Sequence, residues 1–327
     1  MAKLVLGLGS SHSPQLSLPV DMWRVHGEND KRNPHLYDRS GRHVTYDELL
    51  AKADPSLRKE LAPETWERRH KACQEGIARL AATLARVAPD VLIMVGDDQE
   101  ELFHEDLMPA LLIYWGEEIR SLPQVYREAF PPSAHAALWA YGTEERTYPV
   151  AADLGRHLVE HLIDEGFEPA HSRRLPEGKG MGHAFGFVYQ RVMNGTVIPT
   201  VPVMLNTYYP PNQPTPRRCL ELGKALRRAV EAWERDARVA FIASGGLSHF
   251  VIDEELDQMA LKAMQAHDEA ALAALPRERI NSGTSELRNW LVVAGAATDL
   301  DMQLFDYVPC YRSEAGTGCA MAFAAWT

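Results

Sequence analysis

The sequence has few cysteines, no long apolar run and no excess of positive charge. Its 327 residues include four cysteines, none in a CxxC pair, which excludes a fold built on disulfides. No stretch approaches the roughly 18 consecutive apolar residues that a membrane span needs, so we expect none. The formal net charge is -11, which disfavours nucleic acid as a partner.

The beginning of the chain also lacks the features of a secretory leader. The letters MAKLVLGLGSSHSPQL contain an apolar run that is too short for a signal peptide, and no small-residue cleavage site follows it. We therefore expect a cytoplasmic protein. An acidic cytoplasmic enzyme is the class that fits this composition best.

The composition present is that of an ordinary globular protein, with 46% hydrophobic and 24% charged residues. There is no sharp change of composition and no internal repeat along the chain. The sequence therefore predicts one domain over residues 1–327. The polar stretch at about 20–63 is rich in turn-forming residues, and we expect it to be an irregular insertion at the surface.

Apolar strand-like runs alternate with amphipathic helical patterns. Strands are predicted at 3–9, 91–96, 239–244 and within 196–209. Helices are predicted at 64–87, 217–236 and 285–297, the last opened by a Thr or Ser cap. This alternation predicts a single large α/β domain with a mixed central sheet flanked by helices.

Three of the predicted strands end in polar residues that could bind a ligand or take part in catalysis. His12 follows the first strand, Asp97, Asp98 and Gln99 follow the second, and His249 follows the strand at 239–244. Ligands collect at the carboxyl ends of strands in α/β sheets, so we expect these side chains to share one cleft. Two histidines and a carboxylate are the ligands of the facial metal site found in non-haem iron oxygenases.

A pair of glycines precedes His249 in the stretch FIASGGLSHF. Glycines at the end of a strand allow a sharp turn or the close approach of another group. The pair Gly245-Gly246 is therefore expected to place His249 at the mouth of the sheet.

These motifs, in this order, resemble the class III extradiol ring-cleavage dioxygenases. The stretches SSHSP, PDVLIMVGDD, GMGHAFGF, PVMLNTYYPPNQPTPRRCLELGKAL and SGGLSH all contribute, and the resemblance covers nearly the whole chain. It is strongest to the catalytic subunit of protocatechuate 4,5-dioxygenase and to gallate and 3-O-methylgallate dioxygenases. The resemblance implies Fe(II)-dependent meta cleavage of a catecholic or gallate-type aromatic acid by dioxygen. It also implies a homodimer, with a separate small subunit in some members.

The resemblance assigns roles to four residues. His12 matches the first histidine ligand of the iron, and Glu286 matches the glutamate ligand. His249 matches the catalytic histidine, which accepts and donates a proton without binding the metal. His183 matches a second histidine near the substrate.

One position departs from the family pattern. Members typically carry an Asp-His pair after the second strand, and that histidine binds the metal, whereas this chain has Asp98-Gln99. The prediction assigns the ligand role to Gln99, through its amide oxygen. Asp98 or Asp97 could supply a carboxylate ligand instead, or His104 could act as the histidine ligand if the loop is rearranged. The metal could also be lost.

An anionic substrate would be repelled by the chain's net charge unless local cations bind it. Arg312 is the predicted carboxylate-binding residue, with Arg217 and Arg218 as further candidates. Tyr208 is expected to be a packing aromatic. Two other functions stay open: a metal-dependent hydrolase, and a non-catalytic binding protein on the same scaffold.

Overall fold

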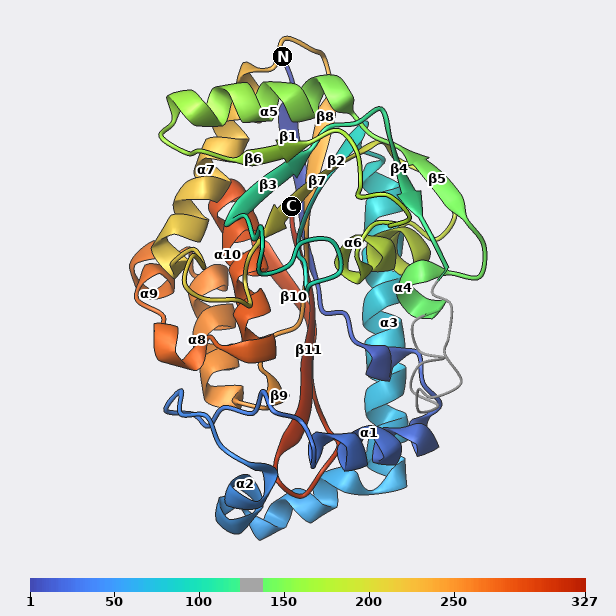
Figure 1. Cartoon of the computed structure of the whole chain (residues 1–327), viewed down its shortest axis with the longest axis vertical. Helices are drawn as coiled ribbons and strands as arrows, with labels where there is room; N and C mark the ends of the chain where they lie inside the picture. The colour runs from blue at the N-terminus through green and yellow to red at the C-terminus, as the bar shows by residue number, and fades with distance from the viewer. Residues whose placement is uncertain (124–137) are drawn as a thin grey trace.

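The computed structural model describes residues 1–123 and 138–327, and a mixed sheet of nine strands forms its centre (Figure 1). The strand order is β10-β11-β1-β8-β2-β7-β3-β6, and β9 pairs with β11. The strands of this sheet are β1 (Lys3–Ser10), β2 (Val91–Asp97), β3 (Leu111–Tyr114), β6 (Ala170–Ser172), β7 (Thr200–Leu205), β8 (Arg238–Ser244), β9 (His249–Val251), β10 (Met302–Tyr311) and β11 (Thr317–Trp326). A separate ribbon pairs β4 (Glu118–Ser121) with β5 (Arg146–Pro149).

The centre of the sheet is parallel and its edges include antiparallel pairs. Strands β1, β8, β2 and β7 run parallel to one another, while β11 runs antiparallel to β1 and β10, and β3 runs antiparallel to β7. Every residue of β2 is buried, as expected for a strand that is covered on both faces. These features confirm the predicted α/β class with a mixed central sheet.

Helices cover both faces of the sheet. They are α1 (Trp23–Asp30), α2 (Tyr46–Lys52), α3 (Pro63–Val87), α4 (Leu138–Tyr141), α5 (Ala152–Asp164), α6 (His183–Phe187), α7 (Pro216–Ala232), α8 (Glu254–Gln265), α9 (Glu269–Ala273) and α10 (Leu287–Ala296). The predicted helices at 64–87 and 217–236 correspond to α3 and α7. Within the described residues, no helix combines the length and the apolar character needed to cross a membrane.

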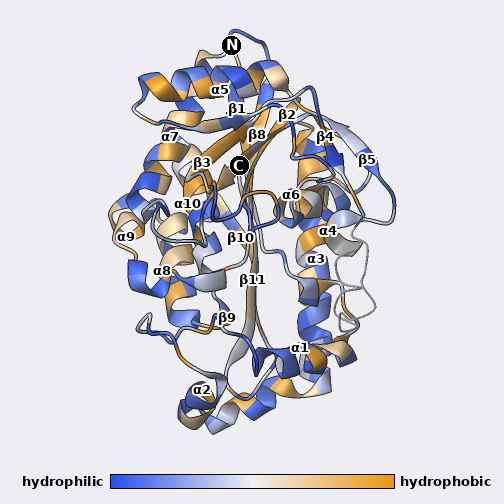
Figure 2. Cartoon of the chain, viewed as in Figure 1, coloured by the Kyte–Doolittle hydropathy of each residue, from blue (hydrophilic) through white to orange (hydrophobic). Residues whose placement is uncertain are grey.

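Alternate residues of the central strands face two separate layers of the core. Ile93 and Val95 of β2 pack with α5, α7 and α10, whereas Leu92 and Met94 pack with α3 and α6. Helices α7 and α10 accordingly lie on one side of the strands in Figure 1, and α3 and α6 on the other. Figure 2 shows that central strands such as β3 and β8 are predominantly hydrophobic and that the helices alternate between apolar and polar residues.

Two local predictions differ from the structure. The stretch 20–63 is not wholly irregular, because it contains α1, α2 and short 3-10 turns. Thr45 begins α2 with a capping box, in which its side chain and that of Glu48 bond each other's backbone amides. The predicted Thr or Ser cap of α10 is absent, because Thr284 instead bonds the backbone of His249.

Helices α7 and α10 pack closely because glycines lie at their contact. A methyl group on Gly223 would overlap the carbonyl oxygen of Val292, and one on Gly295 would overlap that of Leu220. The glycine residues therefore allow the two backbones to approach each other. Helix α10 begins directly after Glu286, so this contact fixes the position of that carboxylate relative to the sheet.

Gly223→Ala should destabilise the protein by about 1–3 kcal/mol, because the methyl group must displace backbone in a packed core. In an unhindered helix the same change would raise the free energy of unfolding by up to about 1 kcal/mol, so the sign of the effect is diagnostic. Urea unfolding measures it. Arg217→Ala, an exposed change on the same helix, is the control and should alter stability by less than about 0.5 kcal/mol. A stabilised Gly223→Ala protein would contradict the close contact.

Candidate active site

Three neighbouring parallel strands end together and bring their polar residues to one edge of the sheet. Strand β8 lies between β1 and β2, with Ser10 opposite Ser244 and Val95 opposite Ala243. The residues that follow these positions therefore emerge side by side. Glu286 reaches the same place from the other direction, at the end of a 3-10 turn that leads into α10.

His12, Asp97 and Glu286 form a buried group that could hold a metal ion. One ligand atom from each lies within 4.8 Å of the others, and His12 Nε2 is 3.6 Å from Glu286 Oε2. None of the three residues is more than 4% exposed. The structure thus brings together two predicted ligands, His12 and Glu286, and adds Asp97.

The ring of His12 is oriented by Ser244. The Ser244 hydroxyl donates to the carbonyl oxygen of Ala184 at 2.6 Å, so it accepts from His12 Nδ1–H at 3.0 Å. The lone pair of the ring then lies on Nε2, the nitrogen near Glu286. Burial lowers the pKa of His12 to about 3, which keeps the imidazole neutral. A neutral imidazole with one oriented N–H is the form that binds metals.

The two carboxylates of this group have opposite electrostatic surroundings. Burial alone would raise the pKa of Glu286, but His249 and the Gly246 N–H, which donates to Glu286 Oε2, lower it to about 2. Burial and the neighbouring Glu286 charge raise the pKa of Asp97 to about 7. Two carboxylates that share a buried space repel each other, and a cation between them would relieve that repulsion. The donor set therefore fits a divalent metal.

The other candidate metal ligands, in the loop after β2, either lie away from the group or make hydrogen bonds to other residues. Asp98 accepts hydrogen bonds from the backbone amides of Leu102 and Phe103, at 3.0 and 3.1 Å. His104 is exposed. Gln99 does lie at the site, where its Nε2 donates to Glu286 at 2.9 Å and to Asp97 at 3.3 Å. Its predicted role as a ligand stays a prediction.

His249 is held in a slot between two glycines. A methyl group on Gly246 would lie 2.7 Å from the imidazole ring, and one on Gly283 would overlap it. The ring's Nδ1 bonds the carbonyl oxygen of Leu247 at 2.8 Å, and Nε2 lies 3.3 Å from Glu286 Oε1. Burial alone would lower the pKa of His249, but Cys319 and Glu286 raise it well above its ordinary value. Gly246 and Gly283 thus make room for the imidazole of His249, which points at the carboxylate of Glu286.

His183 is paired with a carboxylate that sequence reasoning missed. Its Nδ1 lies 2.7 Å from Glu101 Oε2, and Tyr141 donates to the other oxygen of Glu101. Burial alone would lower the pKa of His183, but Glu101 raises it to about 10. The ring of His183 packs edge-on against that of His12, with centroids 4.8 Å apart. His183 is therefore a cation beside the predicted metal site.

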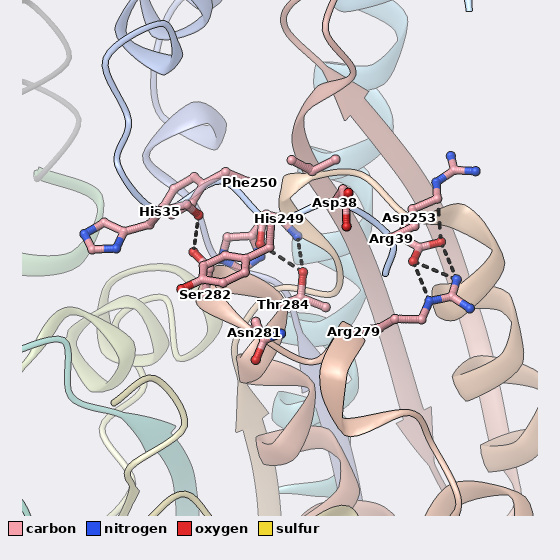
Figure 3. A pocket seen from close by; sticks show the side chains of 12 residues that line it. His35, Asp38, Arg39, His249, Phe250, Asp253, Arg279, Asn281, Ser282 and Thr284 are labelled. Carbon is pink, nitrogen blue, oxygen red and sulfur yellow. Dashed lines mark hydrogen bonds and ion pairs between the residues drawn. The ribbon is translucent and has the colours of Figure 1, made fainter. Parts of the chain in front are cut away.

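A small cavity of about 20 Å³ lies beside His249 (Figure 3). Part of its wall comes from the stretch 20–63, which supplies His35 and Arg39, and Asp253 with Arg279 form a bidentate ion pair at its edge. Arg39 also lines an adjoining cavity of about 620 Å³. The insertion is thus part of the surroundings of His249, which its polar sequence did not reveal.

Arg312 does not face an open site. It is buried, and its Nε and Nη2 each donate to an oxygen of Asp30 at 2.8 Å, while Nη1 donates to Gln15. Arg218, which is on α7, donates to the backbone carbonyl oxygen of Gly166 at the surface. The predicted role of Arg312 in substrate binding stays a prediction, and Asp30 already occupies its guanidinium.

Two further residues lie near the site and were given no part in it by the sequence. Tyr208, expected to be a packing aromatic, has its hydroxyl near Glu286, and burial raises the pKa of that hydroxyl well above the ordinary value. Asp257 binds the residue before His249: its oxygens accept from Ser248 N at 2.9 Å and Ser248 Oγ at 2.6 Å. Asp257 belongs to none of the recognised motifs, and the motif that contains Tyr208 does not by itself place that residue near Glu286, so only the tertiary structure could identify these contacts.

Comparison with known proteins identifies one family over most of the chain. Residues 54–316 match the family described as the catalytic LigB subunit of aromatic ring-opening dioxygenase. The match includes Asp97, Gln99, His183, His249 and Glu286.

Individual relatives are similar over shorter stretches. The chain is 31% identical to a 2,3-dihydroxyphenylpropionate/2,3-dihydroxicinnamic acid 1,2-dioxygenase of a Rhodococcus species, over 46% of this chain and 47% of that protein. It is 27% identical to the enzyme of the same name from Comamonas testosteroni, over 54% and 49%. A gallate dioxygenase of Pseudomonas putida is 34% identical over 32% and 30%. The chain thus spans about half the length, or less, of these relatives.

Asp257 should make stability depend on pH. Burial raises its pKa from 3.8 to about 7, so the folded protein keeps a proton that the unfolded chain has released. The stabilising contribution of this proton is present at low pH and is lost as the pH rises through about 7. The free energy of unfolding of the native protein, minus that of Asp257→Asn, should therefore fall by up to about 4 kcal/mol between about pH 4 and pH 8. Urea unfolding at several pH values measures this difference, and a flat profile would contradict the prediction.

Proposed function

Because the chain belongs to the family of LigB-type catalytic subunits of aromatic ring-opening dioxygenases, we propose that it cleaves a catecholic or gallate-type aromatic acid in the extradiol position. Dioxygen is the co-substrate and Fe(II) the cofactor. The relatives are named for aromatic acids of this kind, dihydroxyphenylpropionate and gallate. The observation that carries the proposal is the buried group of His12, Asp97 and Glu286, with His183 packed against His12 and His249 3.3 Å from Glu286.

The metal would be held by His12, by Glu286 and by a donor from the end of β2 or the loop after it. A bound ferrous ion supplies open positions for two adjacent ring oxygens and for dioxygen, and it allows electron density to pass from the ring to the oxygen. The neutral, oriented imidazole of His12 and the ionised Glu286 are in the protonation states that ligands require. Burial of the group excludes bulk water from the reacting atoms.

His249 is the proposed acceptor of a phenolic proton. Its Nδ1 donates to the carbonyl of Leu247, so the proton that can move is the one on Nε2. In the structure the charge of Glu286 helps to raise the pKa of His249. When that carboxylate is neutralised as a ligand, the pKa of His249 should fall toward its ordinary value, which leaves Nε2 able to take a proton near neutral pH.

His183, which packs against His12, is the proposed source of positive charge at the site. Glu101 keeps it protonated, so its imidazolium can donate a hydrogen bond to a negatively charged substrate oxygen. It can also return a proton when the ring opens. Arg312 remains the proposed carboxylate ligand, but that role requires Asp30 to release part of its guanidinium.

Oxygen uptake tests the proposed function. The purified chain, loaded with ferrous ion under anaerobic conditions, should consume dioxygen when a catechol or gallate from a small panel is added. The same assay on Gln99→His tests whether the family's histidine increases the rate. Turnover that does not depend on dioxygen would instead indicate a metal-dependent hydrolase. No oxygen uptake and no bound metal would indicate a binding protein.

His249→Ala should lower kcat by about 10²- to 10⁴-fold, the usual contribution of a positioned acid–base group. Anaerobic binding of the same substrate should change by less than about fivefold, since the side chain is proposed to act mainly in proton transfer. Stopped-flow kinetics and anaerobic titration measure the two effects. His171→Ala, an exposed histidine on β6, is the matched control and should leave both unchanged. An equal loss in binding and in kcat would contradict the proton-transfer role.

A further inference from the structure

The end of β2 and the loop after it offer a carboxylate and an amide near the place where the family resemblance implies a histidine. Asp97 is the last residue of β2 and has no exposed surface. Its carboxylate lies with His12 and Glu286 inside the 4.8 Å group. Gln99 is two residues further along the chain and only partly buried. The question is which of the two completes the metal site.

The hydrogen bonds of Gln99 argue that it holds the ligands and does not itself bind the metal. Its amide nitrogen donates to Glu286 Oε1 at 2.9 Å and to Asp97 Oδ2 at 3.3 Å. Turning the amide over would place its oxygen against two carboxylate oxygens, which is repulsive. The nitrogen therefore belongs where it is, and it links the two acidic side chains.

Asp97 is oriented in the way that metal ligands usually are. Gln99 donates to Oδ2, and Asn289 Nδ2 lies 3.3 Å from Oδ1 and 3.0 Å from the carbonyl oxygen of Ser244. Hydrogen bonds of this kind hold a ligating carboxylate in position. With a neutral His12, the two carboxylates supply a charge of minus two, which balances a divalent cation.

We propose that Asp97 is the third metal ligand and that Gln99 is a positioning residue for Asp97 and Glu286. This assignment rests on the proposed function, in which the site holds a divalent metal, and it replaces the sequence-based choice of Gln99. The resulting site has one histidine and two carboxylates. Carboxylate oxygen is a better ligand for Mn(II) than imidazole nitrogen is. A site with one histidine and two carboxylates should therefore favour Mn(II) more than a site with two histidines would.

Binding of Mn(II) to the full chain, measured by anaerobic calorimetry, tests the assignment. Asp97→Asn should weaken binding by at least about 100-fold, because loss of even a supporting residue costs about 10- to 100-fold. Gln99→Leu should weaken it by only about tenfold and should also alter the electron paramagnetic resonance spectrum of bound Mn(II), since the carboxylates lose their common donor. Glu105→Gln, an exposed carboxylate on the same loop, should bind as the native chain does.

Thermal unfolding of the metal-free proteins separates loss of a ligand from misfolding. Asp97→Asn removes a carboxylate that lies beside Glu286, so this variant should unfold at the same temperature as the native chain or higher.

A second variant exchanges the donors: Asp97→Asn combined with Gln99→His should recover Mn(II) binding in part. It should also raise the affinity for Zn(II) relative to Mn(II) by at least about tenfold over the native ratio.

The outcomes distinguish this assignment from the proposed function. A larger loss in Gln99→Leu than in Asp97→Asn would overturn the assignment, as would native affinity in Asp97→Asn, and neither result would contradict a ring-opening dioxygenase. Metal binding that depends on Asp97 in a chain without oxygen uptake would support the assignment and contradict the proposed function. A native chain that binds no divalent metal would overturn both.

Discussion

The site depends on one buried carboxylate, Glu286. Burying a charge is unfavourable unless hydrogen bonds and opposite charge compensate it, and here they come from separate parts of the chain. Gly246 donates its backbone amide, Gln99 its side-chain amide, and His249 faces Glu286 at 3.3 Å. Gln99 and His249 are at Oε1 of Glu286, while Gly246 and His12 are at Oε2. The position of Glu286 thus determines how the ends of three strands are arranged around it.

Glycine makes this arrangement sterically possible. A side chain at Gly245 would press against Glu286, and side chains at Gly246 or Gly283 would occupy the place of His249. The close contact of α7 with α10 through Gly223 then fixes the helix that follows Glu286. Glycines at these positions do not mark flexible turns. They are the places where a charged side chain and an imidazole must approach the backbone closely.

Charge also divides the site into two sides with different roles. Glu101 keeps His183 positively charged, whereas burial keeps the neighbouring His12 neutral and Ser244 orients its ring. Two imidazoles that pack edge to face at 4.8 Å therefore carry different charges. This difference suits a ligand for a cation on one side and a donor to an anionic substrate on the other. It arises from partners distant in sequence, so neither histidine's motif could reveal it.

The sequence by itself determined the α/β class, the main helices and strands, and the residues that follow the parallel strands, because alternating and helical apolar patterns are local properties. It also indicated His12 and His249, since polar residues after buried strands must meet at one sheet edge, and it indicated Glu286 through the resemblance to the family. Only the tertiary structure decided that Asp97 joins them, that Gln99 links two carboxylates and that Asp30 occupies Arg312. These are contacts between side chains up to some 280 positions apart, and their direction depends on packing and on the balance of buried charge, which no local pattern encodes.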